Sequence, residues 1–405
     1  MKFSKLRQLF LVSTIGLLVA TLLTACQIVT IDFVYVASSA GSGSTSSGQI
    51  DIFAVDSQSG ALRPGPASVS SGGVQPVAMA VSASFANIYV ANQDKSVVHF
   101  ALALHGEATQ KDVITLSAAP VAIAVNQAGT YLYVVSGLTG GQLTEYALSS
   151  DGTIGAVTFQ TALTLPSNPA DVIIPTAVTV LANNAAVYVA AYDQAAYNPG
   201  GQTNPNAPNP GWVFGYSVAT GGLLTPSANS PFKAGVKPSA LAGDPTNRFL
   251  YVTDFASNQL IGFSIQSGYH LTFLLNGPFK TGNEPVAIAI DPRGKFIYVA
   301  NSLDSSISAY AIDLSTGTPS IAVAATGGGT NNVTDTQPVA IVIDPALGRF
   351  VYTANYLGNS VSGFRLDPNA GSITANQATP YPTGAKPTAI VSVPHGNHAL
   401  QSITP

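Results

Sequence analysis

Three short hydrophobic patterns recur in a fixed order along most of the chain. The first is an apolar run centred on Tyr-Val, as in residues 297–301, and the second alternates apolar and polar side chains, as in residues 306–310. The third begins with proline and alternates small with branched residues, as in residues 285–290. Alternation at period two is typical of β-strands, and no long stretch shows the 3.6-residue period of a helix.

The tyrosine run and the proline run each occur seven times. The tyrosines are Tyr35, Tyr89, Tyr133, Tyr188, Tyr251, Tyr298 and Tyr352, and the prolines are Pro76, Pro120, Pro175, Pro238, Pro285, Pro338 and Pro387. Successive tyrosines are 44 to 63 residues apart, which suits a repeat of four antiparallel strands with loops of variable length.

The order of the runs predicts how the repeats close on each other. The chain enters on a tyrosine run at Phe33 and finishes on the proline run at Pro387, so its two ends complete one repeat. We expect residues 387–393 to pair beside the first tyrosine strand, which buries two open sheet edges. The sequence therefore predicts an all-β fold: one seven-bladed β-propeller of four-stranded antiparallel blades over residues 33–394, with a C-terminal tail at 395–405.

Several repeated polar and aromatic residues are expected to build the blades. Asp244, Asp291 and Asp344 each precede a proline after a proline run, which is the chemistry of a tight turn. One aromatic residue per repeat lies in the alternating strand and is expected to pack between blades. These residues are interpreted as structural.

The first residues indicate a targeting segment. A basic start is followed by the mostly apolar residues 9–23, a stretch shorter than a usual membrane span, and then by Leu-Thr-Ala-Cys ending at Cys26. That tetrapeptide resembles a bacterial lipobox, whose cysteine receives a lipid. We expect a lipoprotein signal peptide at 1–25, a lipid anchor at Cys26, a tether at 26–32 and a location in the bacterial cell envelope, facing the periplasm or exterior. An ordinary secretory peptide with an incidental cysteine is the alternative.

The composition of the chain limits which binding partners and cofactors we expect. Only 8% of the 405 residues are charged and the formal net charge is −4, without a run of one sign, so nucleic acid is not an expected partner. Cys26 is the single cysteine, which excludes an internal disulfide. No phosphate-binding loop, catalytic triad order or Cys/His metal spacing is present, so we expect no cofactor and no metal. We also expect a monomer.

Candidate functional residues lie around one axial opening. The loop after each tyrosine strand and the loop before each proline strand meet on the same face, so the residue before each proline is expected to line the rim. Lys237 and Glu284 are the candidate catalytic pair, with Glu284 as general base and Lys237 contacting an oxyanion or phosphate. Alternatively they form a solvated ion pair. The further rim candidates for binding are Asp254, Asn301, Asp304, Asn355 and Lys386, of which Asp254 could instead cap its loop.

The longest insertion, residues 192–212, is rich in Asn, Pro and Gly and belongs to the same face. Its aromatic residues Tyr192, Tyr197 and Trp212 could stack on a sugar ring or a partner surface. A tolerated loop without a binding role is the alternative.

The Tyr-Val-Ala-Asn runs, the Asp-Pro turns and the proline strands resemble the YVTN-repeat and lactonase-like propeller family, which includes 6-phosphogluconolactonase-type enzymes. The resemblance covers nearly the whole chain after Cys26. It implies a seven-bladed propeller and places polar His, Arg and Glu groups of family lactonases around the channel mouth.

Two functions follow from these observations. The first is a binding module at the cell envelope whose loop face recognises a glycan, a peptide or an envelope protein. The second is a lactonase-type hydrolase acting on a sugar lactone, as the family resemblance implies.

Overall fold

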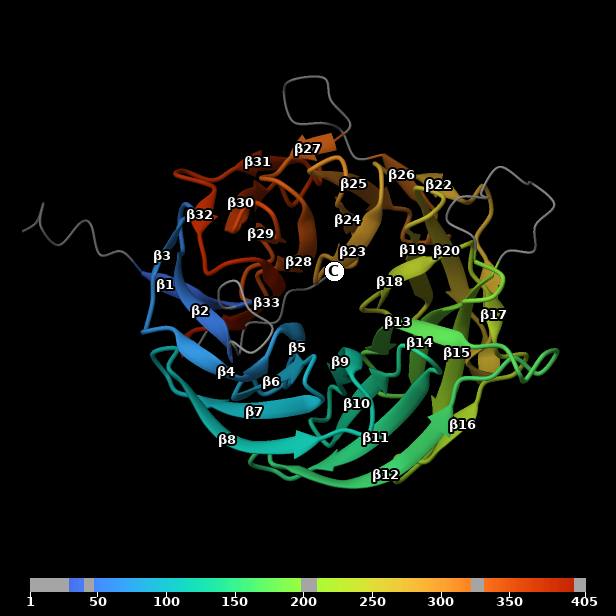
Figure 1. The fold of residues 1–405 in the computed structure, drawn as a ribbon. Coiled ribbons are helices and arrows are strands. Elements are labelled where there is room, and N and C mark those ends of the chain that lie inside the picture. The colour runs from blue at the N-terminus through green and yellow to red at the C-terminus, as the bar shows by residue number, and fades with distance from the viewer. Residues whose placement is uncertain (1–28, 40–46, 198–209, 322–330, 397–405) are drawn as a thin grey trace, which may run out of the picture.

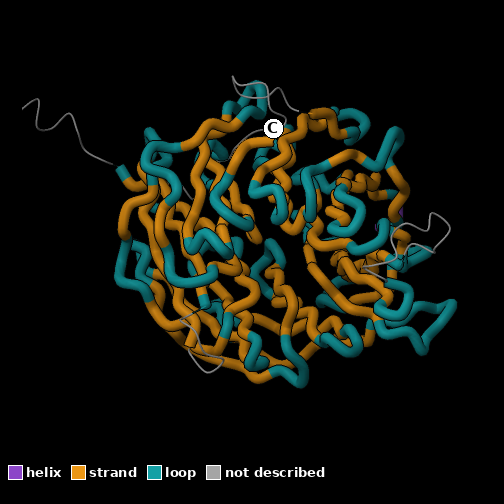
Figure 2. The backbone as a smooth tube through the Cα atoms, turned by 45° about the horizontal axis from the view of Figure 1, so that its top comes forward, coloured by secondary structure: helices purple, strands orange, loops and turns teal. Residues whose placement is uncertain are grey.

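The computed structural model describes residues 29–39, 47–197, 210–321 and 331–396, and these form seven β-sheets in a ring around one axis (Figure 1). Strands and loops make up nearly all of the described backbone (Figure 2). The sheets are numbered here as blades 1 to 7 in the order of their tyrosine strands. The predicted propeller is confirmed.

Blades 1 to 3 are formed by the following strands. Blade 1 contains β33 (Pro387–Pro394), β1 (Thr30–Ser38), β2 (Ser47–Asp56), β3 (Leu62–Pro64) and β4 (Val69–Val74). Blade 2 contains β5 (Pro76–Val81), β6 (Asn87–Asn92), β7 (Ser96–Leu102) and β8 (Ala108–Thr115). Blade 3 contains β9 (Pro120–Val125), β10 (Tyr131–Ser136), β11 (Gln142–Leu148) and β12 (Ile154–Ala162).

Blades 4 to 7 each end in two short outer strands. Blade 4 contains β13 (Ile173–Val180), β14 (Ala186–Asp193), β15 (Gly211–Val218), β16 (Leu224–Pro226) and β17 (Phe232–Lys233). Blade 5 contains β18 (Pro238–Gly243), β19 (Phe249–Asp254), β20 (Gln259–Ile265), the short helix η1 (Ser267–Tyr269), β21 (Leu271–Phe273) and β22 (Phe279–Lys280). Blade 6 contains β23 (Pro285–Ile290), β24 (Phe296–Asn301), β25 (Ser306–Ile312), β26 (Pro319–Ile321) and β27 (Asn331–Val333). Blade 7 contains β28 (Pro338–Ile343), β29 (Phe350–Asn355), β30 (Ser360–Leu366), β31 (Ile373–Ala375) and β32 (Tyr381–Pro382).

The ring closes through the two ends of the described chain. Strand β33 pairs antiparallel with β1, with Tyr35 opposite Val391 and Ala37 opposite Ala389. One hydrophobic cluster fills the interface between blades 7 and 1, where Val34 packs with Tyr352, just as other clusters fill the remaining interfaces. The closing interface is therefore packed like the rest of the ring, as the order of the runs predicts.

The repeated tyrosine links each blade to the next. All seven tyrosines are fully buried, and six of their hydroxyls donate a hydrogen bond to a carbonyl in an outer hairpin of the following blade. Tyr298, for example, reaches the carbonyl of Gly371 at 2.8 Å. Gly371 has a φ of +71°, and a Cβ there would come within 2.2 Å of the Phe296 ring. Tyr133 is the exception and lies beside Glu145.

In three of the five blades with a split outer strand, the split accompanies a glycine on the third strand; blades 1 and 6 have Ile52 and Ala309 there. On the third strand, the residue opposite the tyrosine is glycine in blades 4, 5 and 7, and the following segment folds over it. A Cβ at Gly262, for instance, would come within 2.5 Å of Leu274. In blades 2 and 3 the same position holds His99 and Glu145, whose side chains occupy that space, and the outer strands β8 and β12 are continuous.

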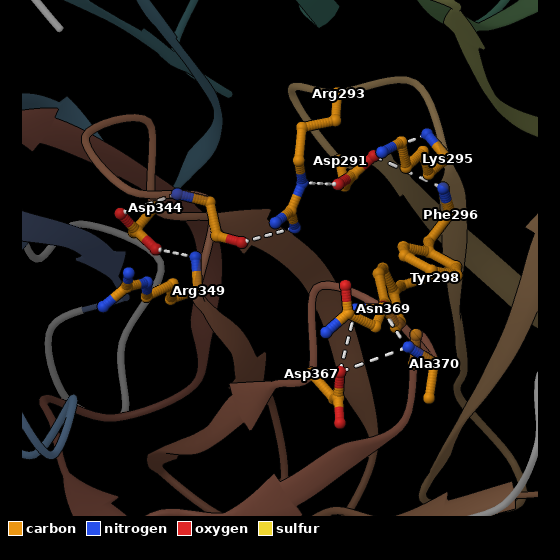
Figure 3. A network of polar contacts seen from close by, with 12 residues as sticks. Asp291, Arg293, Lys295, Phe296, Tyr298, Asp344, Arg349, Asp367, Asn369 and Ala370 are labelled. Atoms are coloured by element: carbon orange, nitrogen blue, oxygen red, sulfur yellow. Dashed lines mark hydrogen bonds and ion pairs between the residues drawn. The ribbon is translucent and has the colours of Figure 1, made fainter. Parts of the chain in front are cut away.

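The turn face is the end of the ring that carries the Asp-Pro turns, and its carboxylates bond to backbone. Asp344 accepts the N–H groups of Arg349 and Phe350, among others, and Asp291 accepts that of Lys295 (Figure 3). Asp291 also pairs with Arg293, whose guanidinium reaches the carbonyl of Gly348 in the next blade. These aspartates are structural, as their turn chemistry predicts.

Candidate functional site

The rim lies at the opposite end of the ring from the turn face. In six blades its frame is a backbone hydrogen bond in which the residue after a second strand donates to the carbonyl of the residue before the inner-strand proline. Phe255 donates to Lys237 in this way, and Ser302 donates to Glu284. In blade 4 the donor Gln194 bonds to Val172 instead, and Ile174 lies within β13. We call the residue before the proline the rim position. Its seven members are Gln75, Ala119, Ile174, Lys237, Glu284, Gln337 and Lys386.

Four rim positions share an uncommon backbone conformation. Gln75, Glu284, Gln337 and Lys386 have φ between 52° and 60°, in the left-handed region that non-glycine residues rarely occupy. Such conformations persist where the surrounding structure over-determines them. At Glu284, Asn258 contributes to this restraint because its side-chain oxygen accepts the Glu284 N–H at 2.8 Å.

Lys237 lies among three aromatic rings. Its Nζ is 4.5 Å from the ring centroid of Phe255, 5.2 Å from that of Tyr197 and 5.6 Å from that of Tyr192. The two tyrosine rings contact each other edge-on, with centroids 5.1 Å apart. The structure thus brings together Lys237, Tyr192 and Tyr197 from two neighbouring blades. Cation–π contacts of this kind stabilise an ammonium that has lost part of its hydration.

Burial and Glu284 act on Lys237 in opposite directions. Burial lowers the pKa of the half-buried Lys237 ammonium, and the negative charge of Glu284 partly offsets this. Within the described part of the chain, no ion pair joins these two residues within 4.0 Å, so they interact through space without a direct contact. Burial also raises the pKa of the Tyr192 hydroxyl, which keeps that ring neutral.

Phe255 is a site residue that the sequence patterns did not single out. It directly follows Asp254, the last residue of β19, and its position in blade 7 is held by another aromatic residue, Tyr356. The Nζ of Lys386, at the rim position of blade 1, lies 5.7 Å from the Tyr356 ring centroid. An aromatic residue directly after the tyrosine strand was the available signal for both cation–π contacts.

Other rim candidates hold loops in place. Asp254 is fully buried, and its carboxylate accepts the N–H groups of Val236 and Lys237 at 2.9 and 2.8 Å. Asp254 therefore positions the backbone of Lys237. The exposed Asp304 accepts the backbone and side-chain N–H groups of Asn283 in the loop before Glu284.

The two rim asparagines are also buried. Asn355 donates to the hydroxyls of Ser360 and Ser362 in its own blade. Asn301 donates to Ser306 and Ser308 in the same manner, while its buried Oδ1 has no partner. These amides fix the start of the third strands.

The structure does not bring Trp212 to Lys237. Trp212 lies opposite Ala191 and packs against the cluster between blades 3 and 4, whereas Tyr192 follows Ala191 and faces blade 5. Alternation along a strand places neighbouring residues on opposite faces, which separates the two aromatic residues. Residues 198–209 of the insertion and Cys26 lie outside the described residues.

His99 has a structural role and does not belong to the rim site around Lys237. His99 is buried on β7, where its ring nitrogens contact Asp112 and Asn87 and its ring stacks on Tyr89. It fills the space that glycine leaves open in other blades. In the described part of the chain, no three His, Cys, Asp or Glu side chains converge as metal ligands, and no helix there is long and apolar enough to cross a membrane.

Comparisons with known proteins agree with this architecture. None of the curated proteins matches the chain. The periplasmic gluconolactonase of Pseudomonas aeruginosa aligns over 91% of this chain and 100% of its own, at 18% identity and a TM-score of 0.71. A Bacteroides uniformis protein described as a candidate 6-phosphogluconolactonase aligns over 90% and 100%, at 16% identity and a TM-score of 0.70. At such identities these structures show the fold alone.

The sequence profile described as "Lactonase, 7-bladed beta-propeller" matches residues 33–171 and 223–333. This match supports the lactonase hypothesis more than a binding module. The expected resemblance is confirmed, and the chain belongs to the seven-bladed β-propeller lactonase family.

Proposed function

We propose that the protein is a lactonase-type hydrolase that opens a sugar lactone at the rim between blades 4 and 6. The observation that carries the proposal is the half-buried Lys237 ammonium, which lies among three aromatic rings and interacts electrostatically with Glu284. Membership of the lactonase family supports the same reaction class. The names of the two similar structures point to lactones of sugar acids.

Hydrolysis requires a general base that activates water and a cation that stabilises the negative charge on the lactone carbonyl oxygen. Water attacks the carbonyl carbon while the Glu284 carboxylate takes one of its protons. The Lys237 ammonium stabilises the negative charge that develops on the carbonyl oxygen. The ring C–O bond then breaks, and the ring oxygen leaves as a hydroxyl after taking up the proton. The product is the open hydroxy acid.

The surroundings suit a polyhydroxylated substrate. A cavity of about 420 Å³ beside the loop before Glu284 is lined by Lys280, Asn283, Asp304 and Tyr310, among others, and neither Glu284 nor Lys237 belongs to its lining. Polar side chains there can bond to sugar hydroxyls, and the faces of Tyr192 and Tyr197 offer apolar contact to the ring carbons.

The test is hydrolysis of glucono-1,5-lactone and related lactones, measured through the proton that each opened acid releases. We expect Glu284→Gln to lower kcat by about 10²–10⁴ and Lys237→Met by about 10²–10³. Glutamine fits position 284 because Gln75 and Gln337 occupy the same rim position with φ of 53° and 60°.

The control is Lys111→Gln, which removes an exposed cation from the outer strand β8 of blade 2, away from the rim candidates. Its kcat should stay close to that of the unmodified protein. If the protein opens no lactone of the panel, or if Glu284→Gln and Lys237→Met both keep full activity, the proposal fails, and the binding-module hypothesis gains support.

We also propose that the hydrolase acts at the cell envelope, attached through a lipid on Cys26. The lipobox-like residues before Cys26 support this. Metabolic labelling with a radioactive fatty acid tests it: the protein should be labelled and a Cys26→Ser variant should not. Labelling of both proteins to the same extent would contradict the anchor.

A further inference from the structure

An open pocket on the turn face of blade 7 contains two exposed arginines whose side chains find no acceptor among the described residues. The pocket has a volume of about 520 Å³, and its polar lining comes from Arg349, Arg365, Asp367, Asn369, Ser372 and Thr374. It lies at the end of the ring opposite the rim. None of its residues belongs to the proposed lactone site.

Neither guanidinium contributes a polar contact to the described part of the fold. Across the described residues, neither Arg349 nor Arg365 forms an ion pair, and neither side chain donates a hydrogen bond. Figure 3 accordingly draws only the backbone N–H of Arg349 in contact with Asp344. A guanidinium carries five N–H donors and stays charged at every physiological pH. Two such groups in one pocket are a strong donor set for an oxyanion.

The same position in another blade shows what a structural arginine does here. Arg248 directly precedes Phe249, as Arg349 precedes Phe350, and its Nη2 donates to the carbonyl of Leu314 in the next blade at 2.6 Å. Arg293 likewise reaches the next blade through the carbonyl of Gly348. Arg349 makes no such contact, so inter-blade packing does not account for it.

The charge in the pocket remains positive. Two guanidinium groups stand against the one carboxylate of Asp367, which leaves a formal charge of +1. The Oδ1 of Asp367 is engaged by the N–H groups of Asn369 and Ala370 in its own turn. The hydroxyl of Thr374, directly opposite Arg365 on the paired strand, adds a neutral donor.

We propose that this oxyanion pocket, defined by Arg349, Arg365, Ser372 and Thr374, binds a phosphate group. Paired guanidinium forks match the geometry of phosphate oxygens. The phosphate can come from a free phosphate ion or from a phospholipid headgroup. Headgroups are relevant because β1 begins at Thr30 on the turn face of the neighbouring blade 1 (Figure 1). Val29 lies three residues after Cys26, a span of about 10 Å at most, so the lipid anchor proposed at Cys26 brings the membrane surface close to this end of the ring.

The experiment has two arms, both using protein with Cys26→Ser so that no lipid chain contributes. In the first arm, inorganic phosphate is titrated and followed by calorimetry. In the second, the protein is floated with vesicles of phosphatidylglycerol, with phosphatidylcholine vesicles alongside. We expect saturable binding in at least one arm, and Arg349→Gln with Arg365→Gln should weaken it by about tenfold or more.

The charge-matched control is Arg248→Gln with Lys295→Gln, which removes two cations from the equivalent turn positions of blades 5 and 6. It should bind as the parent does. Asp367→Asn should bind more tightly, because it removes the opposing charge while its side-chain oxygen can still cap the turn. Thermal unfolding of each variant confirms that it folds.

Each outcome decides the proposal. Phosphate binding without vesicle binding assigns a free ion, and arginine-dependent binding to phosphatidylglycerol vesicles assigns a headgroup. Equal losses in the two double variants would mean an unspecific effect of charge, and absence of binding in both arms would mean no site. Either of these two results overturns the proposal.

Discussion

Two carboxylates at opposite ends of the ring, Asp244 and Glu284, have different roles. On the turn face, Asp244 is buried and accepts the N–H groups of Arg248 and Phe249, both at 2.7 Å, so its charge is used by the backbone. At the rim, Glu284 is only half-buried and its charge acts on Lys237 of the preceding blade. The aspartates that repeat from blade to blade stabilise the fold. The residue at the rim position varies between blades, so its side chain can take part in binding or catalysis.

The largest expected effect on stability comes from removing a turn-face carboxylate. Asp244→Ala leaves the N–H groups of Thr246, Arg248 and Phe249 without their acceptor. We expect a loss of about 3 kcal/mol in the free energy of unfolding, measured with urea. Asp313→Ala, in an exposed turn of the same face, is the control and should cost much less. Equal losses would remove the distinction between buried and exposed turns.

A second prediction concerns the turn-face carboxylate that lacks donors. Asp32 is fully buried, no donor group of the described residues reaches its oxygens, and burial together with the neighbouring Asp344 carboxyl raises its pKa well above the ordinary value. The folded state therefore keeps a proton that the unfolded state releases above about pH 4. Stability should fall as pH rises from there through the raised pKa.

Asp32→Asn should remove that part of the pH dependence and make the protein more stable at pH 8 than the parent. Urea unfolding at a series of pH values measures this. Asp313→Asn is the comparison, because its parent carboxyl has a lowered pKa. A parent profile that rises steadily from pH 4 to 8 would contradict a proton held by Asp32.

A smaller effect is expected for the tyrosine links between blades. Tyr298→Phe removes a buried hydrogen bond of 2.8 Å to Gly371 and should cost about 1.5 kcal/mol. Tyr131→Phe removes an exposed hydrogen bond of the same length to Gly221 and should cost about 0.5 kcal/mol or less. Thermal or urea unfolding measures both. A larger loss for Tyr131→Phe would show that burial does not set the strength of these links.

The smallest effect on stability is expected at the rim. Glu284→Gln should change the free energy of unfolding by less than about 0.5 kcal/mol, since glutamine occupies two equivalent positions. It should nevertheless lower the pKa of Lys237 further, because the Glu284 charge opposes the effect of burial. The pH dependence of Lys237 acylation, read by mass spectrometry, should shift to lower pH. An unchanged profile would show that the two charges are not coupled.

Much of the ring could be predicted because its signals are local. Period-two alternation, the prolines at the inner strands and the Asp-Pro turns each act within one repeat, and their sevenfold recurrence determines the blade number. The order of runs at the two ends also predicts the pairing of β33 with β1. The split outer strands could not be predicted in this way, because in blades 4, 5 and 7 the segment that follows the third strand folds over Gly215, Gly262 or Gly363, a contact between residues that are not adjacent in the chain.

The sequence by itself determined the seven blades, their closure and the rim position that holds Lys237 and Glu284. Only the tertiary structure decided which neighbours these residues meet: Phe255 and two tyrosines surround Lys237, while Trp212 faces the opposite side of its blade. The physical reason is distance along the chain. Strand patterns are set by adjacent residues, whereas contacts across a blade interface depend on how the closed ring places one loop beside another.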